Sequence, residues 1–210
     1  MRFGRGLKSV VHIRMTELCA LAEKYGVDKC PKIFHTYTPE YHATLHPYRS
    51  SFSKFVEIGI GNVPLMRPII GESYRPGASL RMWRDYFSNC QIIGCDILPE
   101  VMFTEERINT YLVDQSKEDS LTTFGEQIDA CDVILDDGSH IKSHMILSFR
   151  TLWKYIKPGG FYIIEDIKRP DLGEFEQLAT VSGFNDAKLI KSHNGRNDWD
   201  SFVIFQKESV

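Results

Sequence analysis

The stretch CDVILDDGSH, residues 131–140, carries the residue types that acid–base and metal chemistry need. Its apolar run up to Asp136 predicts a buried parallel strand, and Asp137 and His140 follow before a helical pattern begins. In open α/β sheets, the carboxyl ends of the strands form the edge where ligands bind. Charged side chains at this position are therefore better placed for catalysis than for folding.

A second acidic pair follows another apolar strand further along the chain. In GGFYIIEDI the strand at 161–164 ends in Glu165 and Asp166. Neighbouring strands lie roughly 4.8 Å apart, so Asp137, Glu165 and Asp166 would be close enough to share one cation if the two strands pair. Carboxylates are ligands that a hard cation such as Mg²⁺ prefers. The spacing predicts a metal site.

Both acids of the first motif also have a simpler interpretation, since an Asp before a helix often caps it. We assign a capping role to Asp136 or Ser139 at most, because four acids at one sheet edge would repel one another without a cation. His144 invites a zinc interpretation, but the Glu that a zinc motif places between its histidines is missing, so packing or surface exposure is expected. His140 is the expected base near neutral pH.

The segment KFVEIGIG, residues 54–61, predicts a buried strand that runs into a glycine turn. Gly59 and Gly61 allow a sharp turn and the close backbone approach that a cofactor needs, and Glu57 brings a carboxylate to the strand end. The following loop, 62–77, is longer than an ordinary connection and rich in Pro and Gly. We expect an irregular segment that folds over the ligand.

Two further predicted strands also end in polar groups. The strand at 91–97 presents Asp96, and an acid there can accept hydrogen bonds from both ribose hydroxyls of a nucleotide-type cofactor. The strand at 107–113 is followed by Asp114 and Gln115. Helices are expected at 16–26, 80–87, 117–127, 142–156 and 172–181, and two final strands at 186–192 and 201–206. This alternation predicts one doubly wound α/β sheet.

Composition bounds the remaining possibilities. The 210 residues are 42% hydrophobic and 25% charged, which suits one globular domain, and the net charge of −3 gives no general reason to expect nucleic acid or an anionic membrane. Residues 1–14 are basic, and we expect a flexible leader, with contact to an acidic partner as the alternative. Residues 15–210 form the single domain, in which about 15–50 make a helical and aromatic lid segment.

The sequence contains no stretch long enough to cross a bilayer and no signal peptide. Its five cysteines are scattered and lack a C-x-x-C spacing, so reduced core thiols are expected. These features predict a cytoplasmic protein without nucleic acid or membrane partners.

Together, the segments VEIGIG, GASLRMW, GCDI, VDQS, LDDGSH, KPGG and IIEDI resemble the class I S-adenosylmethionine-dependent methyltransferases. Within them the chain is most similar to the metal-dependent sugar O-methyltransferases of macrolide and rhamnosyl-antibiotic pathways, the mycinamicin and elloramycin enzymes among them. The resemblance runs from about Met15 to Phe205, and LDDGSH with IIEDI at this spacing is its most specific part. It implies a Rossmann-like, seven-stranded, mostly parallel sheet with an antiparallel last strand and helices on both faces.

The resemblance also implies roles by position. It implies cofactor contacts at Glu57, Gly59, Gly61, Ser79, Asp96, Asp114, Gln115 and Asp136, with Asp114 and Gln115 near the adenine. It implies Mg²⁺ on Asp137, Glu165 and Asp166 and makes His140 the catalytic base. Two departures are the additional N-terminal domain that those enzymes usually carry and the loop after Gly61, which does not match theirs well.

The expected activity is methyl transfer from S-adenosylmethionine to a hydroxyl of a sugar or glycosylated small molecule. A hard cation acidifies a bound hydroxyl, and His140 accepts its proton. A methyltransferase of phenolic diols is an alternative, because a catechol would chelate the same cation. A non-catalytic cofactor-binding subunit of a glycan- or natural-product-modifying complex is another. The incomplete G-x-G-x-x-G disfavours a dehydrogenase. The acceptor, the methylated hydroxyl and a homo-oligomeric state stay open.

Overall fold

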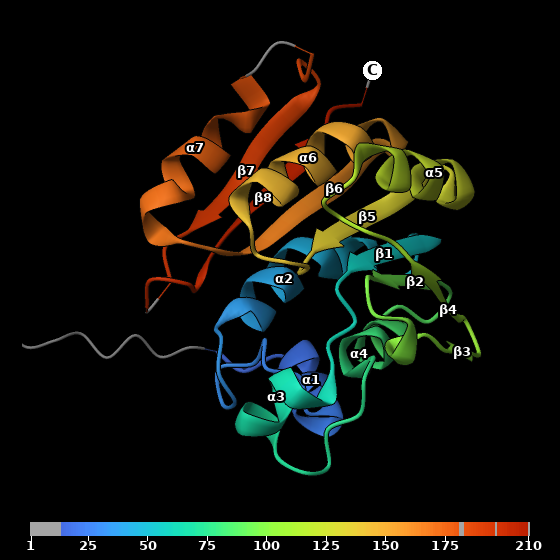
Figure 1. Cartoon of the computed structure of the whole chain (residues 1–210). Coiled ribbons are helices and arrows are strands. Elements are labelled where there is room, and N and C mark those ends of the chain that lie inside the picture. The colour runs from blue at the N-terminus through green and yellow to red at the C-terminus, as the bar shows by residue number, and fades with distance from the viewer. Residues whose placement is uncertain (1–13, 181–182, 196, 210) are drawn as a thin grey trace, which may run out of the picture.

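The computed structural model describes residues 14–180, 183–195 and 197–209, so the predicted basic leader lies outside the described residues apart from Arg14. Its strands are β1 Lys54–Ile58, β2 Gln91–Asp96, β3 Thr104–Glu105, β4 Ile108–Leu112, β5 Cys131–Asp136, β6 Ile156–Ile167, β7 Ala187–His193 and β8 Ser201–Lys207. They form one sheet in the order β3-β4-β2-β1-β5-β6-β8-β7 (Figure 1).

The strand directions are those of the predicted Rossmann-like sheet. Strands β4, β2, β1, β5 and β6 are parallel, and the last strand, β8, pairs antiparallel with β6 and with β7. The prediction of seven strands omitted β3, a two-residue strand that pairs antiparallel with β4 at the edge. So short a strand leaves no periodic pattern in a sequence. The fold prediction is otherwise confirmed.

Helices cover both faces of the sheet. They are α1 Glu17–Tyr25, α2 Tyr37–Leu45, α3 Val63–Ile70, α4 Ala78–Tyr86, α5 Glu118–Ile128, α6 Lys142–Leu152 and α7 Leu172–Glu176, with 3₁₀ turns at His46–Tyr48, Pro99–Val101, Trp153–Tyr155, Arg169–Asp171 and Gln177–Thr180. One core cluster joins α1, α2 and α4 to the face of Phe55, and the other joins α5, α6 and α7 to the face of Val56. Successive strand residues point to opposite faces, so both faces are apolar and buried.

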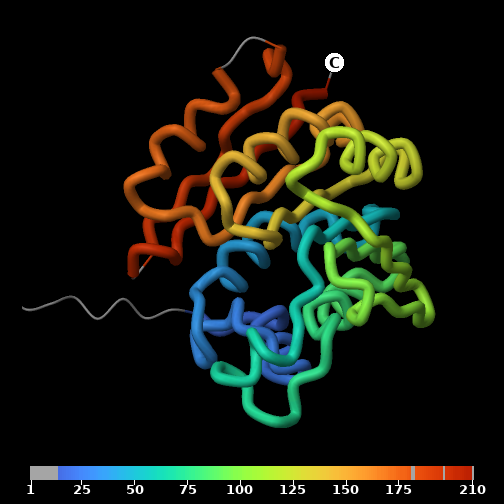
Figure 2. Tube along the Cα trace, viewed as in Figure 1, coloured from blue at the N-terminus to red at the C-terminus, as the bar shows by residue number. Residues whose placement is uncertain are grey.

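The N-terminal helix begins and ends where its sequence predicts. The hydroxyl of Thr16 accepts a hydrogen bond from the Cys19 amide, and Gly26 ends α1 in the left-handed conformation at φ 65°. Helix α1 packs against α4, and the N-terminal segment lies below the sheet in the view of Figure 2. The predicted lid segment is thus attached to the domain through its buried helical face.

The loop predicted at 62–77 contains a helix instead, and that expectation was wrong. Asn62 caps α3 by accepting a hydrogen bond from the Leu65 amide at 2.9 Å, and Pro64 lies in the first turn. A proline there loses no hydrogen bond, because the first amides of a helix have no partner within the helix. Pro64 is therefore compatible with a short helix, whereas Pro68 lies inside that helix.

Two further expectations concern membranes and cysteines. No helix among residues 14–180, 183–195 and 197–209 is long and apolar enough to cross a bilayer. All five cysteines are buried free thiols, as predicted.

Candidate active site at the carboxyl ends of the strands

A cavity of about 530 Å³ opens where β1 lies between β2 and β5. This is the topological switch point of the sheet, because the chain leaves β1 in one direction and returns on its other side. Predicted site residues on its wall are Gly59, Gly61, Ser79, Asp96, Asp114, Gln115, Asp137, His140 and Asp166. The other three, Glu57, Asp136 and Glu165, are completely buried behind that wall.

The glycine turn after β1 is built around the end of β5. Gly59 has φ 97°, and a Cβ atom there would lie 2.0 Å from the carbonyl oxygen of Asp137. Glycine at this position is therefore required by the neighbouring strand, in addition to any room it leaves for a cofactor. Gly61 has φ 75°, and a Cβ atom there would lie 2.4 Å from the hydroxyl oxygen of Tyr74.

Replacing Gly59 by Ala is expected to destabilise the protein strongly. The left-handed backbone costs about 1–3 kcal/mol, and the overpacking against Asp137 adds about 1–3 kcal/mol. Gly71 is the matched control, since it has φ 99° and an added Cβ atom there would meet nothing within 4 Å. Urea unfolding should show a clearly larger loss for Gly59→Ala than for Gly71→Ala. Equal losses would mean that the contact with Asp137 is unimportant.

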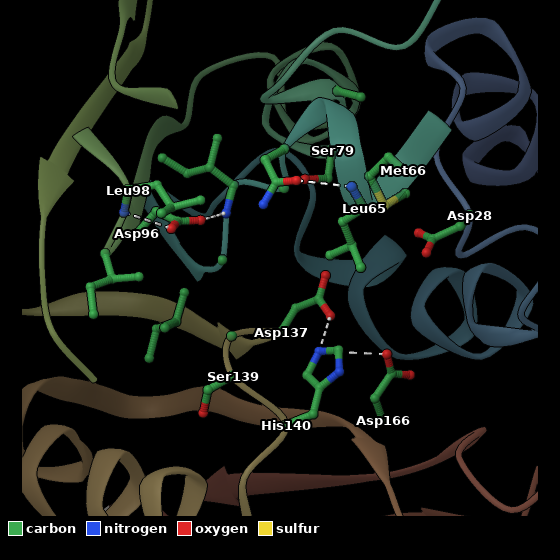
Figure 3. Close-up of a pocket in the computed structure, with 18 of the residues that line it drawn as sticks. Asp28, Leu65, Met66, Ser79, Asp96, Leu98, Asp137, Ser139, His140 and Asp166 are labelled. Carbon is green, nitrogen blue, oxygen red and sulfur yellow. Dashed lines mark hydrogen bonds and ion pairs between the residues drawn. The ribbon is translucent and has the colours of Figure 1, made fainter. Parts of the chain in front are cut away.

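Asp96 fastens the glycine turn to β2. Its Oδ2 accepts a hydrogen bond from the Ile60 amide at 2.9 Å, and its Oδ1 accepts one from the Leu98 amide at 3.0 Å (Figure 3). Each carboxylate oxygen has a second lone pair, so the carboxylate is fixed in place and can still accept from a ligand. Its predicted ribose contact remains a prediction.

Glu57 reaches the cavity through Ser79, whose hydroxyl donates to Glu57 Oε2 at 2.8 Å. Burial raises the pKa of Glu57 to about 8, against the opposing effect of Lys29, whose Nζ lies 3.8 Å from Glu57 Oε1. Asp114 follows β4 on the cavity wall and accepts a hydrogen bond from the Ser116 amide at 3.0 Å.

Asp136 organises the loop that follows β5. Gln115 Nε2 donates to Asp136 Oδ1 at 2.8 Å and to Oδ2 at 2.9 Å, while Gln115 Oε1 accepts from the Ser139 amide at 2.9 Å. Burial raises the pKa of Asp136 to about 7. The expected capping role of Asp136 or Ser139 was wrong: Ile141 occupies the N-cap of α6, without a side-chain capping bond. The buried acid holds Gln115 instead.

Asp137, His140 and Asp166 converge on one point. His140 Nε2 lies 3.2 Å from Asp137 Oδ1 and 3.6 Å from Asp166 Oδ2 (Figure 3). One ligand atom from each of the three lies within 4.8 Å of the others, a spacing that suits a shared metal ion. His140 and Asp166 have φ 54° and 52°, and only two other described non-glycine residues have positive φ. Such strained backbone concentrates at functional sites.

The charge of His140 depends on these carboxylates. Burial opposes its protonated form, but the hydrogen bond to Asp137 and the nearby charge of Asp166 prevail and raise its pKa to about 9. His140 can act as a base only when other positive charge neutralises those two acids, because its neutral form is the proton acceptor.

Lys29 lies among the acids, and sequence reasoning missed it. Its side chain is 2% exposed, and its ammonium group donates to Asp137 Oδ2 and Glu165 Oε2. Although burial opposes the charged form, the carboxylates of Asp137 and Glu165 hold the pKa of Lys29 well above its usual value. The converging acids thus have a cation supplied by the chain itself.

A hard divalent cation also fits the acids that remain. Glu165 Oε1 is buried and has no hydrogen-bond partner among the described residues, although Glu165 Oε2 is paired with Lys29. A buried carboxylate oxygen without a donor is destabilising, and a metal ion would satisfy it. The group spaced to share one ion is Asp137, His140 and Asp166, and Glu165, paired with Lys29, is not part of it; the carboxylate oxygens of Asp137 and Asp166 suit Mg²⁺.

Comparison with known proteins agrees with the resemblance inferred from the sequence motifs. No protein-family model matches the chain. The 8-demethyl-8-alpha-L-rhamnosyl tetracenomycin-C 2'-O-methyltransferase of Streptomyces olivaceus is 38% identical over 151 residues, which are 72% of this chain and 38% of that protein. The mycinamicin VI 2''-O-methyltransferase of Micromonospora griseorubida is 35% identical over 154 residues, 73% and 37% respectively. The chain spans less than half the length of these curated relatives.

The MycE methyltransferase of the mycinamycin biosynthetic pathway, solved in complex with Mg, SAH and mycinamycin VI, superposes with a TM-score of 0.73. It is 26% identical and covers 93% of this chain, which spans 55% of that one. In fold and sequence, this chain resembles the class I methyltransferases. The resemblance inferred from its motifs is confirmed.

An aromatic side chain of the N-terminal segment supports Asp166 from behind the cavity wall. The hydroxyl of Tyr37 donates to Asp166 Oδ1 at 2.5 Å, and His35 Nδ1 lies 2.7 Å from Asp200 Oδ1. Tyr37 is completely buried and stacks on His35. Tyr37, which lies in the predicted aromatic lid segment, therefore packs in the core. The segment's richness in hydrogen-bonding aromatic residues was the available signal for a role beside the site.

Proposed function

We propose that this chain transfers a methyl group from S-adenosylmethionine to a hydroxyl of a sugar or glycosylated small molecule, with Mg²⁺ held by Asp137, Glu165 and Asp166. The observation that carries the proposal is the convergence of His140 with Asp137 and Asp166 on strained backbone beside a cavity at the switch point. The names of the relatives, which methylate sugars of antibiotics, support the acceptor class.

Each group on the cavity wall receives a role in this proposal. The cofactor occupies the half lined by Gly59, Gly61, Asp96, Asp114 and Gln115, and supplies the electrophilic methyl group. Glu57 and Asp136 act from behind the wall by positioning Ser79 and Gln115, which donate to them.

The remaining groups handle the proton of the acceptor. When bound, Mg²⁺ supplies Lewis acidity and orients the acceptor. His140 Nε2 receives the proton of the acceptor hydroxyl as the new O–C bond forms and the S–CH₃ bond of S-adenosylmethionine breaks. Asp137 and Asp166, whose carboxylates lie within 4 Å of Nε2, stabilise the imidazolium that results. Holding both reactants in line contributes much of the remaining rate enhancement.

The proposal extends to domain organisation and surroundings. Residues 15–210 form the domain, and 15–50 act as the lid segment, which is supported by the positions of Asp28, Phe34 and His35 on the cavity wall. The free buried thiols agree with a cytoplasmic location. The proposed partner is a sugar-containing small molecule, without nucleic acid or membrane, and self-association is left to direct measurement.

Calorimetric titration of S-adenosylmethionine into the protein, followed by a transfer screen, tests this function. We expect saturable binding and methylation of a glycoside in Mg²⁺ that stops in excess chelator, because the acids cannot replace the cation's Lewis acidity. The screen includes nucleotide sugars, simple glycosides and catechols. Methylation of catechols alone would favour the phenolic alternative. Binding without any turnover would favour the non-catalytic subunit, and turnover in chelator would contradict the role of the metal.

A further inference from the structure

A second hollow, of about 370 Å³, lies beside the group formed by His140 and Asp166. Its walls come from the loop after β5, the loop after β6 and the segment between β7 and β8, which contributes Trp199. Ser139, His140, Asp166 and Trp199 line both this hollow and the larger cavity. The two spaces therefore adjoin at the side chains to which the proposed function assigns the proton and the metal.

The two hollows differ in the chemistry of their walls. The glycine turn and Asp96 line only the larger cavity, which makes that space the one suited to a nucleotide-type cofactor. The second hollow has neither feature, and its volume lies within the range of small-molecule sites. A transfer between two reactants needs a place for each of them, with the reacting atoms in line.

The wall of the second hollow combines an aromatic plane with apolar and charged groups. The Trp199 side chain is 49% exposed, whereas the other two tryptophans, Trp83 and Trp153, are 0% and 4% exposed. Lys168 Nζ lies over the Trp199 ring, 4.3 Å from its centroid, and covers one face, so a ligand would pack against the other face; Ile141 is 50% exposed on the same wall. Burial of an indole is strongly favourable, so an indole this exposed in a concave site indicates a surface that a ligand covers.

We propose that this second hollow is the acceptor subsite, in which a sugar ring packs its C–H face against Trp199 and directs a hydroxyl toward His140. A pyranose has an apolar C–H face and a rim of hydroxyls, and thus matches an aromatic plane flanked by the ammonium group of Lys168 and the apolar Ile141. The inference rests on the proposed function, because it assigns the second substrate of that reaction.

The test compares Trp199→Ala and Trp199→Phe in the full-length chain, with the glycoside that the transfer screen shows to be methylated. We expect Trp199→Ala to raise the KM for that glycoside about tenfold or more, and Trp199→Phe to restore most of the affinity. Because Trp199 also lines the larger cavity, the dissociation constant of SAH is measured in both variants, and it should change much less than the KM. Ile97→Ala is the reciprocal control, because Ile97 is 58% exposed and lines only the larger cavity. It should weaken SAH binding and leave the glycoside KM near its parent value.

Fluorescence gives a second readout that needs no turnover. Trp199 is the exposed member of the three tryptophans, so the same glycoside added with SAH and Mg²⁺ should change the emission of the parent and not that of Trp199→Phe. A glycoside KM and an emission response that are insensitive to Trp199 would overturn the subsite while leaving the proposed function intact. SAH binding without methylation of any glycoside would instead defeat the proposed function, and the subsite with it.

Discussion

Replacing Lys29 by Met is expected to remove about 3–5 kcal/mol from the free energy of unfolding, the usual penalty for deleting one partner of a buried ion pair. The lysine is 2% exposed, and its ammonium group is the cation between Asp137, Glu165 and Glu57. Methionine fills a similar volume but leaves Glu57 and Glu165 without their positive neighbour and Asp137 with His140 alone, so the acids must either repel one another or take up protons. Chemical denaturation at neutral pH measures the loss.

The matched control for Lys29→Met is Lys32→Met in the same segment. Lys32 is 59% exposed, and its Nζ lies 2.9 Å from Glu23 Oε1, so its removal should change stability by no more than about 0.5 kcal/mol. The double variant Lys29→Met/Glu165→Gln should recover part of the loss, because it removes the unpaired negative charge together with its partner. Added Mg²⁺ should raise the melting temperature of Lys29→Met more than that of the parent. Equal stability of Lys29→Met and Lys32→Met would contradict the role of Lys29 as the internal cation.

The acids of this site could be predicted because their positions follow from local patterns. An apolar run identifies each strand, and the polar residue that ends the run marks the carboxyl edge. The pairing of β5 with β6 then sets Asp136 opposite Ile164, which brings Asp137 level with Glu165. Placing Asp137 beside Glu165 required only that β5 and β6 be neighbours, and they are adjacent in the sheet.

Lys29 could not be found in this way. It is separated from Asp137 by 108 positions and from Glu165 by 136, and it follows a helix stop, where no periodicity signals burial. Converging acids require positive charge, which need not come from a metal ion alone. A lysine in the chain meets part of the same requirement. Helix α3 was missed for a local reason: Pro64 lies in its first turn, where proline is tolerated, and Pro68, inside the helix, is a residue that normally predicts a break.

His140→Asn is expected to lower turnover by about 10²–10⁴-fold, the usual contribution of a positioned general base. Asparagine is chosen because His140 has φ 54°, and Asn tolerates the left-handed region better than other side chains with a Cβ. The amide cannot take up the proton of a hydroxyl at neutral pH. Fold and SAH affinity should therefore stay close to those of the parent, while the chemical step slows. Initial rates at saturating acceptor measure this, together with SAH titration.

Asp129→Asn controls for the backbone in the His140 experiment. Asp129 has φ 53° at the end of α5 and lies outside both hollows, so its replacement by Asn keeps the same conformation away from the site. Turnover by this control should match the parent. If His140→Asn also turned over at the parent rate, the proton would have to leave by another route, with His140 serving only to hold Asp137 and Asp166. A loss of turnover with a parallel loss of SAH binding would indicate collapse of the loop after β5. Only a selective loss of the chemical step identifies the base, since positioning through Asp136 and Gln115 would survive in the variant.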